Sequence, residues 1–410
     1  MRVVTEAELG RVLGSVPGTP RVVASGNHVA PLRALRVLDA AVAEYRLHML
    51  NAQPGIPDRE GVTYETAFVG PGMRAHPRLS YFPCRLSLVP YLLRQRLQPD
   101  IVVVHTSRPV DGAVSLGVEV NILPAAIETA RARGGLVIAQ ANAAMPVTYG
   151  DAVVSLDAID YLIEVDEPLP AHDPAPVDAV GAAIGERVAG LIPEQATLQM
   201  GIGVIPDATL LALRERRGLR IWTEMFSDGV LALEKAGCLD PDTPVTASFC
   251  FGSAELYDWI DRNPRVRMLR TEKTNDPGAI AAHPRLMSVN SALQVDLFAQ
   301  ANASRVGSRV HSGFGGQTDF IVGAMHSPGG HAIIALRSWH PKADVSSVVP
   351  LVSGPVTSFQ HSYIVTEQGV AEIWGHDSLD QAQNILDQAA HPAARDRLRE
   401  AGWALGLPLR

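Results

Sequence analysis

The sequence has 410 residues, of which 47% are hydrophobic and 19% are charged, and its formal net charge is -8. This composition is typical of a folded globular chain and lacks the low hydrophobicity and high charge of disordered proteins. The negative charge disfavours nucleic acid or an anionic membrane as a partner, because both require a basic surface. At roughly 100–200 residues per domain, we expect two or three domains.

The sequence also limits the compartment and the cofactors. Cys84, Cys238 and Cys250 are widely spaced and form no CxxC pair, so we expect no disulfide framework, no metal site and a reducing cytoplasm. The first residues mix acidic, basic and apolar types, which is unlike a signal peptide. No run approaches the ~18 apolar residues of a membrane-spanning helix, so we expect no membrane partner.

The first part of the chain alternates short apolar runs with longer amphipathic ones. The β-branched runs predict buried strands at Val22–Ala24, Ile101–Val104 and Leu136–Ala139. The amphipathic segments predict crossover helices at Pro31–Leu47 and Leu123–Arg133. This order indicates an open α/β domain with a largely parallel sheet.

A proline-rich stretch then interrupts the pattern. Asp166–Val177 holds four prolines, which remove backbone donors and disfavour helix in the residue before each of them. The following segment, Val177–Ile192, places its apolar residues on one helical stripe. We therefore predict two domains, residues 1–176 and 177–410.

The alternation of strand and helix starts again after this boundary. The predicted elements are a strand at Thr197–Met200, a helix at Pro206–Arg216, and strands at Leu219–Thr223, Ala332–Leu336 and Tyr363–Thr366. The predicted fold class is therefore α/β, with two open domains whose parallel or mixed sheets are flanked by helices.

Two segments join a predicted strand to a predicted helix through residues suited to chemistry. In QMGIGVIP, residues 199–206, two glycines let the backbone approach a ligand near a helix N-terminus, although a tight turn explains them equally simply. In WTEMFSDG, residues 222–229, Glu224 lies at the strand end where open α/β sheets bind ligands. A glutamate there is also compatible with a helix cap or a salt bridge.

Other segments in the second half add to this pattern. HSGFGGQTDF, residues 311–320, has three glycines in four positions and is suited to an anion-binding nest or to a flexible surface loop. Glu367 ends the strand of YIVTEQG, and Asn275 begins the turn signal NDP; each alone reads as structural. Since no Ser-His-Asp order, metal-ligand spacing or Walker motif occurs, the candidate nucleophile is a carboxylate, and the residues indicate acyl or phosphoryl chemistry.

The order of motifs along nearly the whole chain resembles the acetyl-CoA hydrolase/transferase family, and within it the 4-hydroxybutyrate and butyryl-CoA:acetate type of CoA-transferase. The matching segments are HTSRPVDGAVSLG, NAAMPVTYGD, QMGIGVIPDATLLAL, TEMFSDGVLAL, ELYDWIDRNP, TNDP, MSVNSALQVDL, SGFGGQTDF, VVPLVSGPVT, YIVTEQGVAEIWG and AHPAARDRL. The resemblance implies a pair of open α/β domains of the CoA-transferase type that assemble as a homodimer or larger homo-oligomer.

The resemblance also implies roles for individual residues. Glu224 matches the nucleophilic glutamate, Met200 and Gly316 the two arms of an oxyanion hole, Asn275 a residue that orients the substrate carboxylate, and Glu367 a second glutamate near the site. The residues expected to bind CoA are Gln199, Met200, Gly201, Ile202, Gly203, Ser312, Gly313, Gly315, Gly316 and His331.

Four positions depart from the family pattern: Trp222 replaces a histidine, Ala299 a glycine, Ser347 an arginine, and His331 a lysine expected at the CoA phosphates. The first two departures are expected to reshape the acyl pocket, and the last to weaken CoA binding.

The implied reaction moves CoA between an acyl-CoA and a short carboxylic acid. The glutamate attacks the thioester and then carries CoA as a glutamyl thioester, so the only ligands expected are acyl-CoA and carboxylate, with no permanently bound cofactor. Two alternatives remain open: an acyl-CoA hydrolase on the same site, and a non-catalytic protein that binds CoA or a sugar phosphate.

Overall fold

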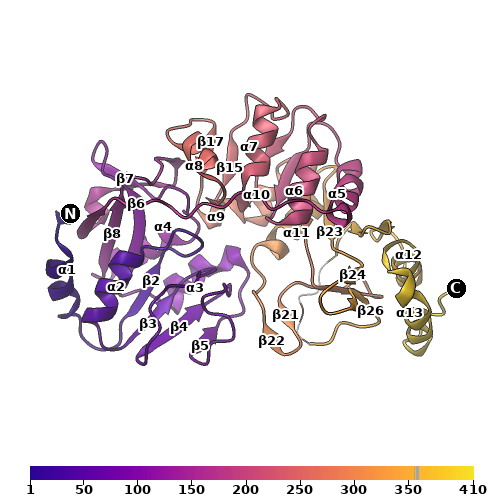
Figure 1. The fold of residues 1–410 in the computed structure, drawn as a ribbon, viewed down its shortest axis with the longest axis horizontal. Coiled ribbons are helices and arrows are strands. Elements are labelled where there is room, and N and C mark those ends of the chain that lie inside the picture. The colour runs from indigo at the N-terminus through magenta and orange to yellow at the C-terminus, as the bar shows by residue number, and fades with distance from the viewer. Residues whose placement is uncertain (355, 357–359) are drawn as a thin grey trace. The chain divides into compact units, whose positions relative to one another are not determined.

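The computed structural model describes residues 1–354, 356 and 360–410, so the family segment at 348–357 lies partly outside the described residues (Figure 1). The chain forms two compact units. The first contains Met1–Asp173 and Val245–Thr274, and the second contains Pro174–Pro244 and Asn275–Arg410. The chain first passes from one unit to the other after Asp173, close to the predicted boundary at residue 176. Its return to the first unit at Val245 was not predicted.

Strand pairing explains this return. β17 (Val266–Met268) pairs in parallel with β15 (Val245–Ala247) and also with β9 (Tyr149–Gly150). The segment after residue 244 thus completes a small sheet with a strand from the first 173 residues. A pairing partner about 100 residues away leaves no local signal in the sequence.

The first unit is built on an eight-stranded parallel sheet. Its order is β1-β11-β8-β6-β2-β3-β4-β5, and every neighbouring pair is parallel. The strands are β1 (Arg2–Val3), β2 (Arg21–Ala24), β3 (Tyr45–His48), β4 (Val62–Thr66), β5 (Leu79–Tyr81), β6 (Ile101–Ser107), β8 (Leu136–Asn142) and β11 (Tyr161–Val165). All seven residues of β6 are buried, which confirms the continuous apolar run as a central strand.

Helices complete the first unit. They are α1 (Glu6–Leu13), α2 (Leu32–Ala41), α3 (Val89–Gln95), α4 (Leu123–Ala132), α8 (Ala254–Ile260) and α9 (Thr271–Thr274). The expected helix over Pro31–Leu47 was too long, because its last residues form β3, where Tyr45 and Leu47 are buried and Arg46 is exposed. That alternation belongs to a strand, and the helical stripe ends at residue 41.

The second unit begins at the proline-rich stretch. Residues 166–178 carry no helix or strand, as predicted. Helix α5 (Ala179–Leu191) then starts at Asp178, whose side chain accepts a hydrogen bond from the backbone N–H of Gly181. This N-cap fixes the helix start two residues after the predicted one.

The second unit has a six-stranded sheet in the order β13-β12-β18-β23-β27-β28, parallel except for the last pair. The strands are β12 (Thr197–Met200), β13 (Arg220–Ile221), β18 (Leu286–Asn290), β23 (His331–Ala335), β27 (Tyr363–Val365) and β28 (Val370–Glu372). The α/β fold class is confirmed. Four of the five predicted second-half elements lie within two residues of their expected ends, while the helix predicted at Pro206–Arg216 forms earlier, at residues 204–212.

The helices of this unit are α5, α6 (Val204–Ala212), α7 (Asp228–Lys235), α10 (Pro277–Ala281), α11 (Gln317–His326), α12 (Ser378–Asn384) and α13 (Pro392–Ala404). The connection β12–α6–β13 runs across the sheet in one direction, and β18–α11–β23 runs in the other. Since such crossovers are right-handed, these opposite directions put α6 and α11 on opposite faces of the sheet. The neighbouring strands β12 and β18 therefore form a topological switch point, the place where open α/β sheets bind ligands.

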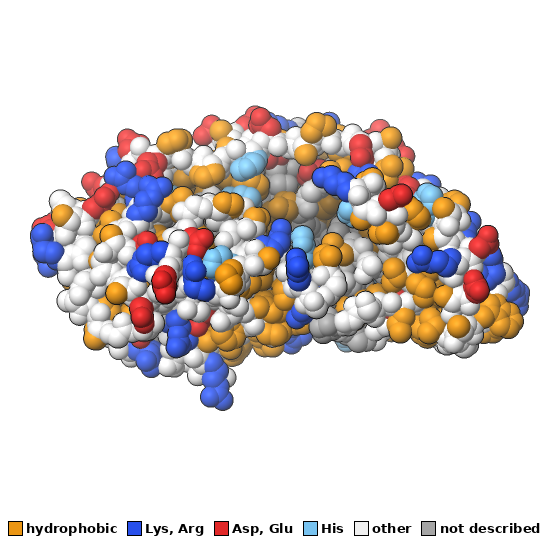
Figure 2. Space-filling view, turned by 60° about the horizontal axis from the view of Figure 1, so that its bottom comes forward, with side chains coloured by type: hydrophobic (Ala, Val, Ile, Leu, Met, Phe, Trp, Pro, Cys, Tyr) orange, Lys and Arg blue, Asp and Glu red, His pale blue; other side chains and the backbone are white. Residues whose placement is uncertain are grey.

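A buried apolar cluster underlies the second unit, with Phe320 of α11, Ile334 of β23 and Ile364 of β27 fully buried at its centre. The C-terminal elements also leave large hydrophobic side chains on the surface, where they mix with charged ones (Figure 2). The largest exposed fractions there belong to Trp374, at 60%, and Trp403, at 61%.

No helix among the described residues is both long and apolar enough to cross a membrane.

Candidate active site

Glu224 lies three residues beyond β13, in a segment that its neighbours fasten to the sheet. The backbone N–H of Trp222 donates to Leu198 O at 3.1 Å, which continues the pairing with β12. The buried hydroxyl of Thr223 then contacts Met200 O at 3.2 Å and Met225 O at 2.9 Å. The backbone on both sides of Glu224 is thus fixed at the carboxyl edge of the sheet, close to the switch point.

The carboxylate of Glu224 meets two neutral donors. Asn275 Nδ2 donates to Glu224 Oε2 at 3.0 Å, and the backbone N–H of Gly316 is also a donor to this carboxylate. Among the described residues Glu224 forms no ion pair, and its side chain meets the N-terminus of α11 rather than that of its own following helix, α7. The fold thus brings together three residues that were predicted separately from the sequence: Glu224, Asn275 and Gly316.

Burial raises the pKa of Glu224 to about 7, and the negative charge of Asp319 acts in the same direction. The hydrogen bonds from Asn275 and Gly316 oppose this rise without cancelling it. A carboxylate with a raised pKa is more basic and hence a better nucleophile than an ordinary surface glutamate.

Gly316 is required by a close approach rather than by backbone freedom. Its φ of -91° is open to any residue, yet a Cβ atom there would lie 1.7 Å from Glu224 Oε2 and 2.4 Å from Asn275 Nδ2. Gly316 is also the N-cap of α11 and makes no side-chain cap, which leaves the helix N-terminus open toward Glu224. The positive end of the helix dipole therefore faces the carboxylate.

The segment after β12 provides a second open helix N-terminus. Gly203 is the N-cap of α6, has a φ of 118° and makes no side-chain cap, while Ile202 is 47% exposed. Two uncapped helix ends, those of α6 and α11, thus belong to the two faces of the sheet at the switch point. This arrangement is suited to an anionic ligand.

The side chain of Gln199 forms hydrogen bonds with other residues of the protein. Its Oε1 accepts hydrogen bonds from Ser288 Oγ at 2.6 Å and from Asn290 Nδ2 at 3.1 Å. These bonds connect β12 to β18 beside the switch point, and Gln199 is only 5% exposed. Its side chain is therefore placed to hold the two strands in register.

The glycine-rich loop before α11 has a defined conformation. Gly313 and Gly315 have φ values of 133° and 57°, which favour glycine. The hydroxyl of Ser312 donates to Ala303 O at 3.1 Å, inside the protein. A small cavity of about 10 Å³ lies against this loop, and another of about 10 Å³ is lined by Met200, Gly201 and the residues on either side of Glu224.

Glu367 follows β27 at the same edge of the sheet. Its Oε2 accepts a hydrogen bond from the backbone N–H of Ser338 at 2.9 Å, and its Oε1 accepts one from the Ser338 hydroxyl. Burial acts to raise the pKa of Glu367, but these hydrogen bonds outweigh it and hold the pKa below its usual value. Within the described residues no hydrogen bond joins Glu367 to Glu224.

His331 is the first residue of β23, at the amino end of the strand, whereas Glu224 and Gly316 belong to the carboxyl edge. Its Nδ1 contacts Ser362 Oγ at 3.2 Å, and its ring packs against Tyr363. Burial lowers its pKa, so the ring is mostly neutral near pH 7. The expected role of His331 at the CoA phosphates stays a prediction.

The other departures from the family pattern also have local explanations. Trp222 packs against the ring of His283. Ala299 has a φ of 58° in a turn after β19 (Gln294–Asp296), where a glycine would be unstrained. The backbone of Ser347 bonds Ser338 and Val295. None of the contacts named here involves Glu224.

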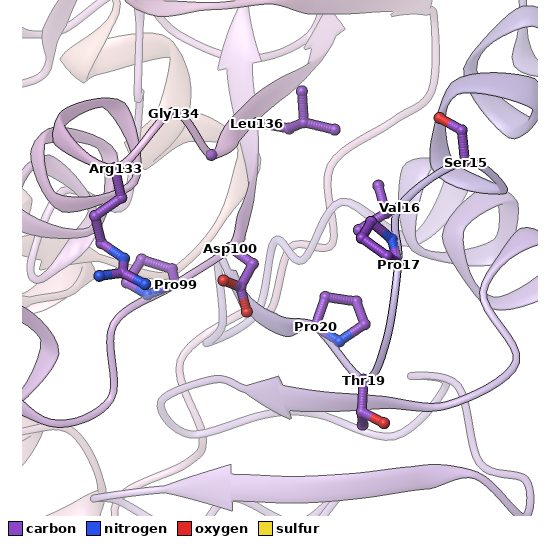
Figure 3. Close-up of a pocket in the computed structure, with 11 residues that line it drawn as sticks. Ser15, Val16, Pro17, Thr19, Pro20, Pro99, Asp100, Arg133, Gly134 and Leu136 are labelled. Atoms are coloured by element: carbon purple, nitrogen blue, oxygen red, sulfur yellow. The ribbon is translucent and has the colours of Figure 1, made fainter.

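The first unit holds a cavity of about 400 Å³, and none of the candidate site residues lines it (Figure 3). It opens at the amino ends of β2, β6 and β8 and is lined largely by proline, glycine and apolar side chains, with Asp100 and Arg133 at its rim. Asp100 is already bonded to the backbone N–H of Arg21. Since open α/β sheets bind ligands at the opposite edge, we assign no substrate to it.

Sequence reasoning named the loop of α11 but gave no role to Asp319, and it missed Thr223 and Ser338. Asp319 is fully buried in the first turn of α11, three residues after Gly316. An acidic residue in the first turn of a helix is usually read as favourable to the helix dipole, which hid its relation to Glu224. No group of three His, Cys, Asp or Glu residues in the described chain is arranged to hold a metal ion.

The fold and the site together define an α/β protein with a poised carboxylate at a switch point. Comparison with known proteins identifies the family: residues 20–171 match the acetyl-CoA hydrolase/transferase N-terminal domain, and residues 252–402 match the C-terminal domain. The chain belongs to the acetyl-CoA hydrolase/transferase family and is an enzyme.

Individual relatives agree with this assignment. The chain is 37% identical over 371 residues to 4-hydroxybutyrate coenzyme A transferase from Clostridium kluyveri, covering 86% of this chain and 85% of the relative. The solved structure of 4-hydroxybutyrate CoA-transferase from Porphyromonas gingivalis has a TM-score of 0.82 at 31% identity, covering 98% of both chains. That of RipA from Yersinia pestis has a TM-score of 0.91 at 26% identity, covering 99% of this chain and 98% of the other.

Proposed function

We propose that this enzyme transfers CoA from an acyl-CoA to a short carboxylic acid, with Glu224 as the covalent nucleophile. The observation that carries the proposal is the contact among Glu224, Asn275 and Gly316. A basic carboxylate is held there between two neutral N–H donors at an open helix end. Membership of a hydrolase/transferase family supports the reaction class.

The first half-reaction loads CoA onto the enzyme. A carboxylate oxygen of Glu224 attacks the thioester carbonyl, the C–S bond breaks, and CoA leaves as a thiolate, which gives a mixed anhydride. The thiolate then attacks the glutamyl carbonyl and releases the donor acid as a carboxylate. The enzyme is left as a glutamyl-CoA thioester, and neither step requires a proton.

The second half-reaction reverses these steps with the acceptor acid. Its carboxylate attacks the glutamyl-CoA carbonyl and expels the thiolate, which then attacks the new acyl carbonyl and restores Glu224. Each attack on the glutamyl carbonyl places negative charge on its oxygen. The donors already in contact with Glu224, Asn275 Nδ2 and Gly316 N–H, are placed to stabilise that charge, at roughly 3 kcal/mol for each donor.

We place CoA along the two segments that end in the open helix N-termini. These are Gln199–Gly203 before α6 and Ser312–Gly316 before α11. The backbone N–H groups at these two helix ends suit the anionic parts of CoA. Gln199 contributes by holding β12 to β18, and Glu367 remains a proposed second glutamate whose orientation is set by Ser338.

The test combines substitution with trapping. Glu224→Gln should abolish transfer between propionyl-, butyryl- or succinyl-CoA and acetate, because an amide is not a nucleophile here, while its unfolding temperature stays close to that of the wild type. Glu186→Gln, an exposed change on α5, is the matched control and should retain activity. Incubation with acyl-CoA alone should give a borohydride-reducible thioester on the peptide that contains Glu224.

The results also separate transfer from hydrolysis. Acyl-CoA consumed at the same rate with and without acetate, with free CoA as product, would identify a hydrolase that uses the same glutamate. A label on a cysteine peptide, or full activity in a folded Glu224→Gln protein, would remove Glu224 as the nucleophile.

We also propose a cytoplasmic homodimer or larger homo-oligomer. Cys84, Cys238 and Cys250 form no disulfide with one another, which is compatible with a reducing compartment. The exposed Trp374 and Trp403 on the C-terminal elements are candidates for burial between copies. Sedimentation equilibrium of the full chain checks the assembly, and a monomer at micromolar concentration would contradict it.

A further inference from the structure

Helix α11 brings a second carboxylate to the side of Glu224. Gly316 and Asp319 are three residues apart at the start of this helix, and residues at that spacing lie on the same helix face. The missing Cβ of Gly316 points at Glu224 Oε2, so this face of α11 is the one turned toward Glu224. Asp319 has no exposed surface.

Two other acidic residues on neighbouring elements, Asp276 and Asp207, interact with groups other than Glu224. Asp276, which precedes α10, caps that helix by accepting from Ala279 N at 2.7 Å. Asp207 of α6 interacts with Asp228 of α7. Asn275, the other direct partner of Glu224, is neutral. Among the described residues, Asp319 is the one charged group that acts on Glu224 from the elements packed around it.

We propose that Asp319 is a positioning residue whose buried negative charge keeps Glu224 a strong nucleophile. The inference rests on the proposed role of Glu224 and adds a second residue to it. A like charge in a poorly solvated site disfavours the glutamate anion, and that anionic charge leaves the glutamyl group when its oxygen bonds to the acyl carbon. The repulsion therefore raises the energy of the starting carboxylate more than that of the neutral anhydride.

The same charge sets the pH dependence of the reaction. Glu224 must be ionised to attack, so activity falls as the pH drops through its pKa of about 7. Removal of the charge on Asp319 lowers that pKa, so the acid limb moves to lower pH. The plateau rate also falls, because a less basic carboxylate is a weaker nucleophile.

The experiment measures kcat/KM between pH 5 and 9 for wild type, Asp319→Asn and Asp319→Glu, with the best donor of the acyl-CoA panel and acetate. For Asp319→Asn we expect the acid limb to move down by about one pH unit and the plateau at pH 9 to fall. Asp319→Glu keeps the charge and should leave the limb near its wild-type position. Asp380→Asn, a first-turn aspartate of the surface helix α12, is the control and should change neither quantity.

Asp319 is fully buried, so a variant that misfolds would give no activity to compare. A second measurement therefore reads the electrostatic interaction directly. Asp319 must be charged while Glu224 titrates, so the coupling is read on Glu224 itself: in Asp319→Ser, a second and smaller substitution, the carboxyl group of Glu224 should titrate at lower pH than in wild type. Infrared or carbon-13 spectra of carboxyl-labelled protein report this without any assay of activity.

The outcomes distinguish this inference from the proposed function. If borohydride labels Glu224 but Asp319→Asn keeps the wild-type acid limb, Asp319 has no such role and the nucleophile stands. If the limb moves equally in Asp319→Glu, packing rather than charge is responsible and the inference is overturned. If Glu224 titrates at the same pH in wild type and in Asp319→Ser, it is also overturned. If trapping fails while the titrations remain coupled, the proposed function fails and the electrostatic pair is real.

Discussion

A single methyl group at Gly316 is the sharpest test of how closely Glu224 is held. The Cβ of Gly316→Ala would lie 1.7 Å from Glu224 Oε2, whereas ordinary contact begins at 3.4 Å. The carboxylate oxygen must therefore retreat by more than 1 Å, and it must leave Asn275 Nδ2, which is itself 2.4 Å from the new methyl. The backbone is unaffected, since a φ of -91° suits alanine.

The expected cost follows from that displacement. A reacting group misplaced by about 1 Å loses roughly 100-fold in rate, which corresponds to about 2.7 kcal/mol of activation free energy. We expect kcat to fall by at least this factor. The KM for the acyl-CoA should change less, because the substituted atom meets the nucleophile rather than the open loop.

The assay is steady-state transfer at pH 8, together with thermal unfolding of each variant. Gly190→Ala is the matched control, since Gly190 lies in α5 with no atom within 4 Å of the added methyl. That change should leave kcat unaltered and stabilise the helix slightly. A folded Gly316→Ala enzyme with kcat within threefold of wild type, a bound we set at roughly 0.7 kcal/mol, would refute the close contact and the site built on it.

Three further predictions concern other positions. Ala299→Gly should raise the free energy of unfolding by roughly 0.5 kcal/mol in urea titrations, since relief of about 1–2 kcal/mol of left-handed strain exceeds the ~0.8 kcal/mol of one buried methyl; a loss of stability would contradict it. Burial raises the pKa of Glu119 from 4.5 to about 7, so its contribution to stability is full below pH 4.5 and is lost as the pH rises to about 7, by roughly 3 kcal/mol. Glu119→Gln should therefore gain stability over wild type between pH 5 and 8, and parallel stability curves would count against this. For His331→Gln we expect an unchanged KM for CoA from pH 6 to 8, and a pH-dependent loss of CoA affinity would place His331 at the CoA phosphates.

Much of the fold could be read from local patterns. The apolar run at Ile101–Val104 became a central strand, because a strand covered on both faces needs no polar alternation. The proline-rich stretch at 166–177 was also legible, since proline acts on its own backbone. The prediction of a single helix over Pro31–Leu47 was wrong at its C-terminal end. There, only three residues separate α2, which has about three turns, from the four-residue strand β3.

The site was partly predictable for a different reason. Strand ends in an open α/β sheet share one edge, so Glu224 and the QMGIG turn could be grouped from order alone. The contact between Glu224 and Gly316 joins residues 92 positions apart and depends on the absence of a side chain, which no periodicity reports. His331 shows a different limit, because correspondence of a position to a family motif does not say at which end of a strand the side chain lies.

The partners of Glu224 also bear on the choice between transfer and hydrolysis. Water attacking a glutamyl-CoA thioester must lose a proton, so hydrolysis benefits from a general base beside the carbonyl. The two direct contacts of the carboxylate are N–H donors, from Asn275 and Gly316, and neither accepts a proton. Of the other carboxylates assigned to the site, Asp319 has no exposed surface and Glu367 already accepts two hydrogen bonds from Ser338. A carboxylate acceptor or a CoA thiolate carries its own charge and needs only an oxyanion site. The geometry around Glu224 therefore favours an anionic nucleophile over water, and an enzyme that transfers CoA over one that releases it.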